Sequence, residues 1–291
     1  MTARSRIAAA LALAVILVGC ARRPARVVFL SDFGTTDDSV AICKGVMLGI
    51  APRLEIVDLT HEVPPWSIAD GARLLAGTTP YYPAGTVFVA VVDPEVGGAR
   101  RVVVVVTGRD QILVLPDNGL VTEVVDRDGV REAREITNPA WVPARRSATF
   151  HGRDVFAPVA ARIARGDDWR DVGPPARGLV RLDVSRARLD AHGAAGTVVA
   201  LDGPYGNLVT DVPGEALAEL GWALGDRVPL EVDGRPFVLP FARAFGDVPV
   251  GDGLVYVDSR GRVAVALNRA SFANRYAIAP PVPLTIRRRT P

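Results

Sequence analysis

The pattern of apolar and polar positions divides the chain into an alternating first half and a strand-rich second half. In the first half, compact apolar runs that predict strands lie at residues 27–30, 54–59, 87–93, 102–106 and 112–115. Apolar residues recur at helical spacing over 39–50 and 68–77. Strands that alternate with helices are typical of parallel βαβ units, and near-continuous Val and Ile runs indicate strands covered on both faces. Residues 27–172 therefore predict an α/β domain with a mostly parallel central sheet.

The pattern changes at Gly173-Pro174-Pro175, where we predict a linker over residues 173–178. Beyond it, short runs that predict strands lie at residues 196–201, 207–211, 227–232, 254–258 and 263–267. Asp233-Gly234 and Arg260-Gly261 stand at positions typical of hairpin turns. Residues 179–291 therefore predict a smaller C-terminal β-barrel domain, and the fold class of the whole chain is α/β.

The N-terminus differs from both halves. A positively charged start precedes an apolar run over residues 7–18, which is the layout of a secretory signal peptide and too short for a comfortable membrane span. The run ends in Leu17-Val18-Gly19-Cys20, which resembles the bacterial lipobox, whose cysteine receives a diacylglycerol. We expect a lipoprotein signal peptide over residues 1–20, a lipid on Cys20 and a polar tether over residues 21–26. The alternative is an ordinary N-terminal anchor helix.

Composition narrows the partners and the location. The chain has 291 residues, 49% of them hydrophobic, and its net charge of +2 is scattered. A chain of this length and hydrophobic content can form two domains with buried cores. The scattered charge excludes a basic surface that would bind nucleic acid. Ala21, rather than Asp, after the lipidation cysteine favours the outer membrane, on its periplasmic side. Without the signal peptide Cys43 is the only cysteine, so no intramolecular disulfide is possible and a buried apolar role is expected.

Asp32 opens an acidic stretch that follows the first predicted strand. The stretch includes Asp37 and Asp38 and ends at Ser39, where a helix is predicted to begin. Carboxylates at the carboxyl ends of parallel strands face the ligand crevice of open α/β folds. The plainer interpretation is helix capping by Asp37 or Asp38.

Asp93 and His151 are the strongest candidates for chemistry. Asp93 directly follows an apolar strand and precedes a glycine-containing loop and Arg100. His151 is one of three histidines and stands between Phe150 and Gly152, ahead of an apolar run, which favours a functional imidazole. The plainer interpretations are a surface ion pair of Asp93 with Arg100 and a structural histidine.

Asp202, Tyr205 and Asn207 lie in the stretch DGPYGN of the second half. Turn chemistry explains such residues, but an aspartate and an asparagine beside an aromatic can also grip a ribose diol and a base. The sequence shows no metal-ligand spacing, no phosphate-binding glycine loop and no Gly-x-Ser-x-Gly elbow. We therefore expect no metal and no cofactor.

These clusters occur together in one family. The matching stretches are SDFGTTDDSVAICKGVM, VDLTHEVPPWSIADGARLL, YYPAGTVFVAVVDP, LPDNGL, FHGRDVFAPVAA, DGPYGNLVTDV and VDSRGRVAVALN. In order and spacing they resemble the SAM hydroxide adenosyltransferases, also called SAM hydrolases, which are relatives of the fluorinase and chlorinase. The resemblance covers the chain from Val27 to Ile286. It implies hydrolysis of the small-molecule substrate S-adenosyl-L-methionine (SAM) to adenosine and methionine, without a cofactor.

Residue by residue, the resemblance implies a water-activating set of Asp93, Arg100 and His151. It places a ribose contact at Asp32 and an active-site tryptophan at Trp66. The other substrate contacts that it implies are Asp37, Ser39, Asp202, Ser259 and Arg260 for methionine, and Tyr205, Asn207 and the backbone near Asn268 and Arg269 for adenine. It also implies a homotrimer, in which Asp32 and Asn207 approach one ligand from different subunits.

Asp93 and Gly152 favour hydroxide over halide. The resemblance places a tyrosine of the fluorinase at position 93 and its fluoride-holding serine at position 152. Glu95 departs from the family's usual Pro-Gly-Val-Gly and adds a carboxylate beside Asp93. The alternatives are a halide-using enzyme and a lipoprotein that binds adenosine or SAM without turnover.

The chemistry needs a base more than an acid. The thioether of a sulfonium leaves as a neutral group, whereas water, with a pKa of about 15.7, is a poor nucleophile. A positioned base that accepts a proton from the water raises the reaction rate by roughly 10²–10⁴-fold. The sequence leaves open whether Asp93 or His151 accepts the proton.

The lipobox generates the first prediction. Full-length protein should fractionate with membranes and incorporate labelled fatty acid, and Cys20→Ser should abolish the labelling because the thiol that carries the lipid is gone. Two or more acyl chains give stable anchoring, whereas one is marginal. Labelling that persists in Cys20→Ser would exclude this lipidation site.

Overall fold

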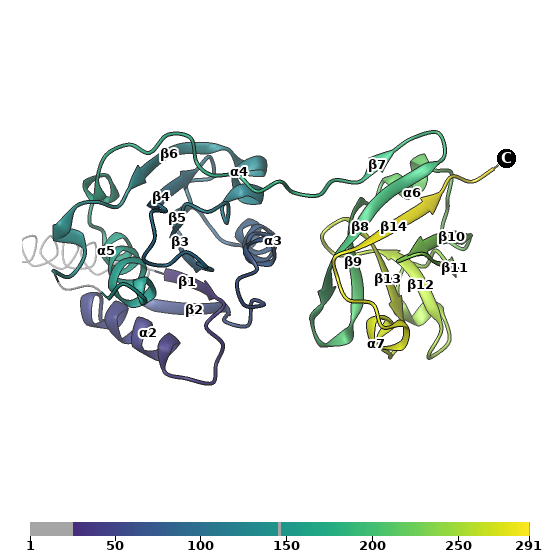
Figure 1. Ribbon diagram of the computed structural model, residues 1–291, viewed down its shortest axis with the longest axis horizontal. Helices are drawn as coiled ribbons and strands as arrows, with labels where there is room; N and C mark the ends of the chain where they lie inside the picture. Colours follow the sequence, from purple (N-terminus) through teal and green to yellow (C-terminus); the bar gives the residue numbers. More distant parts are fainter. Residues whose placement is uncertain (1–25, 145–146, 291) are drawn as a thin grey trace, which may run out of the picture. The chain divides into compact units, whose positions relative to one another are not determined.

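The structure is a computed structural model that describes residues 26–144 and 147–290 (Figure 1). The expected signal peptide over residues 1–20, with its lipidation site at Cys20, lies outside the described residues. The chain divides into two compact units, of which the first ends at Leu182 and the second begins at Asp183. Among the helices that the structure describes, none is long and apolar enough to cross a membrane.

A six-stranded sheet forms the centre of the first unit. Its strands are β1 (Arg26–Ser31), β2 (Glu55–Thr60), β3 (Val87–Val91), β4 (Val102–Thr107), β5 (Ile112–Pro116) and β6 (Val130–Glu135). They lie in the order β2-β1-β3-β5-β4-β6. Strands β2, β1, β3 and β5 run parallel, whereas β4 pairs antiparallel with both β5 and β6. The prediction of a mostly parallel sheet is confirmed.

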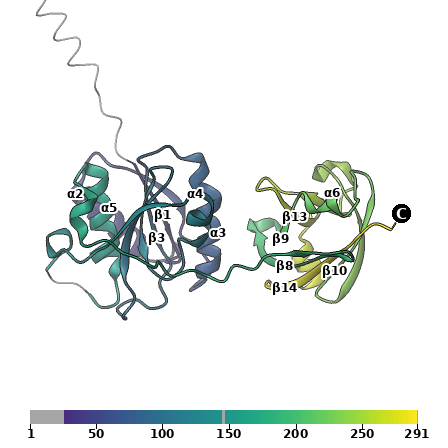
Figure 2. The same cartoon turned by 90° about the horizontal axis from the view of Figure 1, so that it is seen from above.

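Helices cover both faces of this sheet. They are α2 (Ser39–Ile50), α3 (Ile68–Thr78), α4 (Thr122–Asp128) and α5 (Ala157–Arg165). Helices α2 and α5 lie over one face, and α3 and α4 over the other (Figure 2). Phe29 and Met47 are fully buried in the first core, and Phe88 and Leu75 in the second. Each such side chain contributes about 1.5–3 kcal/mol of burial free energy, which holds the strand ends rigidly.

Short helical turns join these elements. They are η1 (Thr79–Tyr81), η2 (Pro139–Trp141), the π-helical turn η3 (Gly152–Phe156) and η4 (Trp169–Val172). The predicted helices at 39–50 and 68–77 agree with α2 and α3 to within one residue. The apolar pattern misses β6, because Ala133 is the only buried residue of that edge strand.

The second unit is an antiparallel sheet that nearly closes into a barrel. Its strands are β7 (Arg188–Leu189), β8 (Gly193–Asp202), β9 (Asn207–Pro213), β10 (Arg227–Val232), β11 (Arg235–Pro240), β12 (Gly253–Val257), β13 (Arg262–Leu267) and β14 (Val282–Arg287). They lie in the order β11-β10-β14-β8-β9-β13-β12, with β7 beside β8. A bridge between Phe241 and Val255 connects the two edges, and the prediction of a C-terminal barrel is confirmed.

Turn chemistry fixes the register of the barrel. Asp233 and Gly234 have φ angles of 52° and 73° and join β10 to β11 as a two-residue turn, as their sequence predicts. The strands β11 and β14 escape prediction because Pro236 and Pro283 interrupt their apolar runs. Short helices α6 (Ala216–Glu219) and α7 (Phe272–Tyr276) and the turns η5 (Gly203–Tyr205) and η6 (Phe245–Asp247) complete the unit.

Candidate active site

Two neighbouring parallel strands of the first unit end beside each other. Strand β1 ends at Ser31 and β3 at Val91, and these two residues are partners in the sheet. Asp32 and Asp93 lie just beyond the strand ends, and the Asp32 N–H donates to the Val91 carbonyl at 3.4 Å. The two acidic clusters of the sequence therefore occupy one edge of the sheet, where open α/β folds bind ligands.

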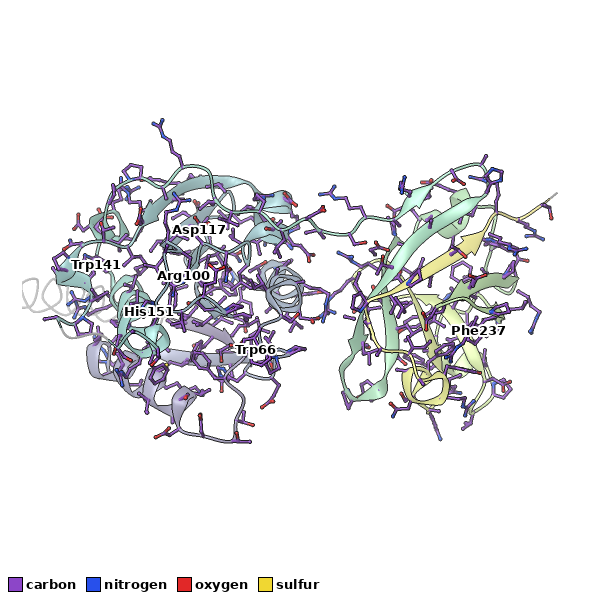
Figure 3. The ribbon with its side chains drawn as sticks, viewed as in Figure 1. Trp66, Arg100, Asp117, Trp141, His151 and Phe237 are labelled. Carbon is purple, nitrogen blue, oxygen red and sulfur yellow. The ribbon has the colours of Figure 1, made fainter. Side chains whose placement is uncertain are left out.

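Arg100 joins Asp93 to His151, and Figure 3 labels Arg100 and His151. Its Nε donates to Oδ1 and Oδ2 of Asp93 at 2.9 and 3.0 Å, and its Nη2 also donates to Oδ2. The same Nη2 lies 2.8 Å from Nδ1 of His151. The Asp93 and Arg100 side chains are only 4% and 5% exposed, and the Phe156 ring lies 5.8 Å from the guanidinium carbon. Three residues that are distant in sequence thus form one hydrogen-bonded set, in which the Asp93 and Arg100 side chains are buried and His151 is half-buried.

The arginine determines the state of the imidazole. A guanidinium is always protonated and has no acceptor, so it can only donate to Nδ1 of His151. Nδ1 therefore accepts, and the proton of the neutral ring lies on Nε2. In this arrangement the histidine presents an N–H, rather than a lone pair, on its other side.

The π-helical turn η3 begins directly after His151 and supports it. Asp154, in this turn, is buried, accepts from both Nε and Nη2 of Arg153 and also accepts from the Ser147 N–H at 2.7 Å. The Arg153 hydrogen bond, helped by the Ser147 N–H, holds the pKa of Asp154 below its ordinary value of 3.8, although burial opposes the shift. Such π-helical turns occur often at functional sites.

Gly152 lies against the Phe33 ring, so a side chain at position 152 would crowd that ring. A Cβ built at this position would lie 2.8 Å from Cζ of Phe33 and 3.4 Å from Sγ of Cys43. Cys43 is fully buried, and burial raises the pKa of its thiol to about 12, so the thiol stays protonated. The expected apolar role of Cys43 is confirmed.

Asp32 contacts Trp66, which the family resemblance also places at the site. Oδ2 of Asp32 accepts a hydrogen bond from the backbone N–H of Trp66 at 3.0 Å. Trp66 has a φ angle of 66°, which is unfavourable for a bulky residue, and its side chain is 74% exposed. The carboxylate thus holds a strained backbone that presents an indole to solvent, a combination that is concentrated at ligand sites.

Asp37 and Ser39 form a local contact at the start of α2. The Ser39 N–H donates to Oδ1 of Asp37 at 2.9 Å, whereas the side chain of Asp38 makes no capping hydrogen bond. The capping interpretation therefore applies to Asp37. Both Asp37 and Glu95, the departure from the family pattern, are exposed.

Sequence reasoning missed His61, which anchors the strand end before Asp32. Nδ1 of His61 lies 2.7 Å from Oγ of the fully buried Ser31, and its Nε2 lies 3.1 Å from Oδ1 of Asp58. Lys44 donates to the other oxygen of Asp58 at 2.6 Å. A polar residue directly after β2 was the available signal, because that strand is parallel to β1 and ends at the same edge.

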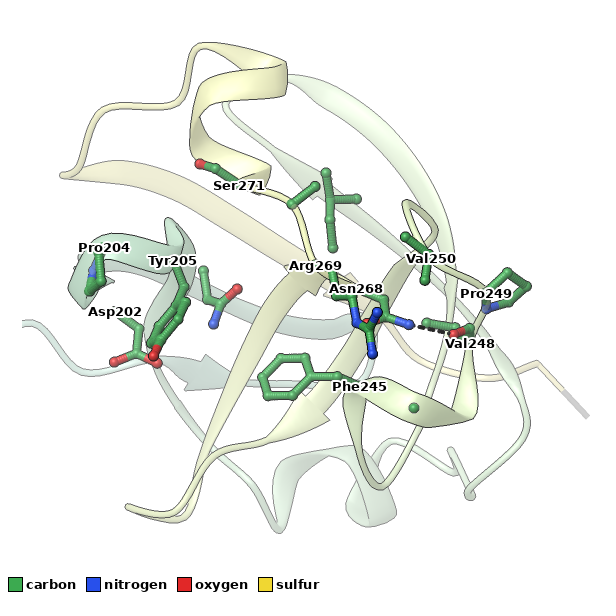
Figure 4. Close-up of a pocket in the computed structure, with 14 residues that line it drawn as sticks. Asp202, Pro204, Tyr205, Phe245, Val248, Pro249, Val250, Asn268, Arg269 and Ser271 are labelled. Atoms are coloured by element: carbon green, nitrogen blue, oxygen red, sulfur yellow. Dashed lines mark hydrogen bonds between the residues drawn. The ribbon is translucent and has the colours of Figure 1, made fainter.

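The second unit contains a groove of about 960 Å³ (Figure 4). Its lining includes five residues that the sequence analysis selected: Asp202, Tyr205, Asn207, Asn268 and Arg269. Nδ2 of Asn268 donates to the Val248 carbonyl at 2.8 Å. Ser259 and Arg260 do not line this groove and lie exposed in the turn between β12 and β13. The structure thus brings part of the expected substrate contacts together.

Phe245 is the aromatic residue of this groove that sequence reasoning missed. Its ring packs against Tyr256 at 5.1 Å between centroids and is 41% exposed. Burial, with Asp202 nearby, raises the pKa of Tyr256 to about 12, so its hydroxyl stays protonated. The exposed Phe245 and the exposed Tyr205 both line the groove and give it flat apolar surfaces as well as polar groups.

Fold and geometry define a two-domain protein with a hydrogen-bonded Asp-Arg-His set in its α/β domain and an aromatic groove in its barrel. The chain belongs to the SAM hydroxide adenosyltransferase family. Sequence profiles of that family's N-terminal and C-terminal domains match residues 27–173 and 196–285.

Relatives within the family carry two names. The chain is 45% identical to the (R)-S-adenosyl-L-methionine hydrolase of Salinispora arenicola, over 87% of this chain and 94% of that protein. It is 35% identical to the fluorinase of Actinopolyspora mzabensis, over 86% of this chain and 93% of that protein. The crystal structure of an uncharacterized conserved protein from Thermotoga maritima matches with a TM-score of 0.85 at 34% identity, over 89% of this chain and 99% of that one.

The Asp154 network predicts a pH-dependent stability. Asp154→Asn should lower the free energy of unfolding by about 1–3 kcal/mol at neutral pH, because it removes the charge from a hydrogen-bonded buried group. The folded-state pKa is depressed, so this stabilisation is present above the unfolded pKa and is lost as the pH falls through the folded pKa. Urea denaturation at about pH 7 and about pH 3 tests this. An equal difference between variant and wild type at both values would contradict the assignment.

Proposed function

We propose that this protein hydrolyses SAM to adenosine and L-methionine by attack of water on C5′ of the ribose. The observation that carries the proposal is the hydrogen-bonded Asp93–Arg100–His151 set, which combines a carboxylate and a cation with buried side chains and a half-buried imidazole. Membership in the SAM hydroxide adenosyltransferase family and the 45% identity to a relative named as a SAM hydrolase support the substrate.

The reaction requires alignment and activation of one water molecule. The carbon–sulfur bond breaks as the new carbon–oxygen bond forms, and the sulfur leaves as a neutral thioether, so no acid is required. Holding water in line with the breaking bond supplies much of the rate enhancement, because the entropy cost of bringing water and substrate into that geometry is already met on binding. Accepting a proton from that water adds roughly 10²–10⁴-fold.

Asp93 is the group that we assign as proton acceptor. A carboxylate has about four acceptor sites, and the three hydrogen bonds from Arg100 leave it able to accept from water. His151 has its lone pair directed at Arg100, so the N–H on its Nε2 holds the water oxygen instead. Arg100 fixes both partners and stabilises the developing hydroxide charge.

The remaining contacts follow from the groove and the strand ends. We assign the ribose to Asp32, beside Trp66, and the adenine to the groove of Tyr205 and Asn207 with the backbone near Asn268. The methionine contacts that we assign are Asp37, Ser39, Asp202, Ser259 and Arg260.

Halide use is the competing chemistry, because a fluorinase is among the relatives. Gly152 and Phe33 argue against it: a serine Cβ at position 152 would lie 2.8 Å from the Phe33 ring. Incubation of soluble protein lacking residues 1–20 with SAM, with and without chloride or fluoride, separates the possibilities. Adenosine in both cases supports the proposal. A 5′-halo nucleoside would support halide use, and no product would support a binding protein.

Variants of the hydrogen-bonded set test the assigned roles. Asp93→Ala and His151→Ala should each lower turnover by roughly 10²-fold or more with little change in KM, the scale of general-base assistance. Arg100→Lys should also impair turnover, because an ammonium cannot reproduce the planar fork that binds both partners. The turnover of the Asp93→Ala/His151→Ala double variant should be scarcely lower than that of the less active single variant, because the residues act as a unit.

Isosteric variants distinguish the proton acceptor. Asp93→Asn should be as slow as Asp93→Ala, whereas His151→Gln, which retains an N–H near the Nε2 position, should be faster than His151→Ala. The reverse order would assign the proton to His151. Glu95→Gly, which restores the usual family loop, is the companion control. A normal melting curve must accompany the rate of every variant, so that loss of fold is not mistaken for loss of catalysis.

We further propose that the protein is anchored to the outer membrane through a lipid on Cys20 and acts as a homotrimer. The lipobox sequence Leu17-Val18-Gly19-Cys20 supports the anchor. The family resemblance supports the trimer, in which Asp32 of one subunit and Asn207 of another approach one substrate molecule.

The assembly has its own test. Multi-angle light scattering of the soluble protein should give three times the mass of the chain at the concentrations used for the assay. Mixing inactive Asp32→Ala with inactive Asn207→Ala subunits should restore part of the activity, because some sites then combine two intact halves. A fully active monomer would overturn the trimer.

A further inference from the structure

Asp117 and Asn118 follow β5 and contact both chain segments that carry the Asp93–Arg100 pair. Nδ2 of Asn118 donates to the Val92 carbonyl at 2.8 Å, the peptide group directly before Asp93. Oδ1 of Asn118 accepts from the Leu120 N–H at 3.2 Å. That second bond fixes which end of the amide faces Val92, since only the NH₂ group can donate to a carbonyl.

Asp117 holds the other segment, next to Arg100. Its N–H donates to the Arg101 carbonyl at 3.0 Å, and its Oδ2 accepts from Nε of Arg101 at 2.8 Å and from Nη2 of the same guanidinium. Its Oδ1 accepts from the Val180 N–H at 2.8 Å. The Asp117 side chain is 1% exposed and the Arg101 side chain 30%, so the carboxylate is shielded from water, which strengthens the hydrogen bonds that it accepts.

The hydrogen bonds of Asp117 and Asn118 act on the chain segments next to the Asp93–Arg100 pair. Val92 precedes Asp93 and Arg101 follows Arg100 in the chain, so Asn118 fixes the peptide group directly before Asp93 and Asp117 fixes the residue directly after Arg100 (Figure 3 labels Asp117 and Arg100). The pair itself depends on a two-point contact between a planar guanidinium and a carboxylate. A displacement of about 1 Å in either segment is enough to cost roughly 10²-fold in rate.

We propose that the Asp117-Asn118 dipeptide is a positioning element that sets the geometry of the Asp93–Arg100 pair without touching the substrate. The inference rests on the proposed hydrolase function. Asp117 has a second duty, because Arg101 also donates to the Arg177 and Gly178 carbonyls and Asp117 binds Val180. Asn118 has no such contact with residues 177–180, so its variants report on positioning alone.

Asn118→Asp is the primary test. The substitution keeps the shape and the acceptor for Leu120 but replaces the donor to Val92 with a carboxylate oxygen, which repels that carbonyl. Asn138→Asp is the matched control, because Asn138 makes the same pair of bonds elsewhere: Nδ2 donates to the Asp171 carbonyl at 2.7 Å and Oδ1 accepts from the Ala140 N–H at 2.9 Å. Both variants lose an equivalent bond, and only one of those bonds reaches the site.

Turnover should separate the two variants. Asn118→Asp should lower kcat by roughly 10-fold or more with KM for SAM changed less than about twofold, and Asn138→Asp should leave kcat near wild type. In an Asp93→Ala background, Asn118→Asp should have almost no further effect, because the residue acts through Asp93. A kcat within about twofold of wild type, or an equal loss in both backgrounds, would overturn the proposal.

A spectroscopic reading makes the test independent of turnover. The ¹⁵N shift of Nδ1 in His151, assigned with the His151→Ala spectrum, reports the hydrogen bond from Arg100. Asn118→Asp should move that signal and leave those of the other two histidines, while Asn138→Asp should leave all of them in place. Unmoved His151 signals would refute positioning even if the protein proved inactive on SAM. Inactive wild type with a shifted His151 signal would refute the hydrolase function alone.

Discussion

One buried guanidinium, shared by a carboxylate and an imidazole, is the interaction on which the site of the first unit depends. A charge removed from water costs several kcal/mol unless it is paired, so Asp93 tolerates its burial only because Arg100 accompanies it. The same arginine directs the lone pair of His151 toward itself. The protonation pattern of the whole set is therefore a consequence of where one arginine side chain lies, and the ring of Phe156 and the strand ends serve to keep it there.

The two units contribute different physical properties. The first unit offers charge in a dry, rigid setting, built on strands that are buried on both faces. The second offers a concave surface of mixed character, in which Tyr205 and Phe245 supply flat apolar faces and Asn207 and Asn268 supply polar groups. Attack on C5′, the ribose carbon that bears the sulfonium sulfur, needs both properties. The dry, charged environment serves the reacting atoms, and the concave surface serves the adenosyl group by which the substrate is recognised.

The sequence predicts elements whose burial follows a clear period and misses those that do not. Strands covered on both faces, such as β1 and β3, are continuous apolar runs, whereas β6 is an edge strand with little burial. At the site, Asp93, Arg100 and His151 were selected from their local sequence, and the structure brings these three residues together. Phe245 and His61 were missed, because their roles arise from strand neighbours and ring contacts that are remote in sequence. Sequence alone likewise carries no sign that Asn118 reaches Val92.

The contact between Gly152 and Phe33 also limits how such a protein can evolve. The ring occupies the space that a Cβ at position 152 requires, so a serine there is accommodated most easily after position 33 has changed. A lineage that moved from water to halide along this route would pass through an ancestor with a smaller residue in place of Phe33. The order of substitutions is thereby favoured by packing, and reconstructed ancestors should show position 33 changing before position 152.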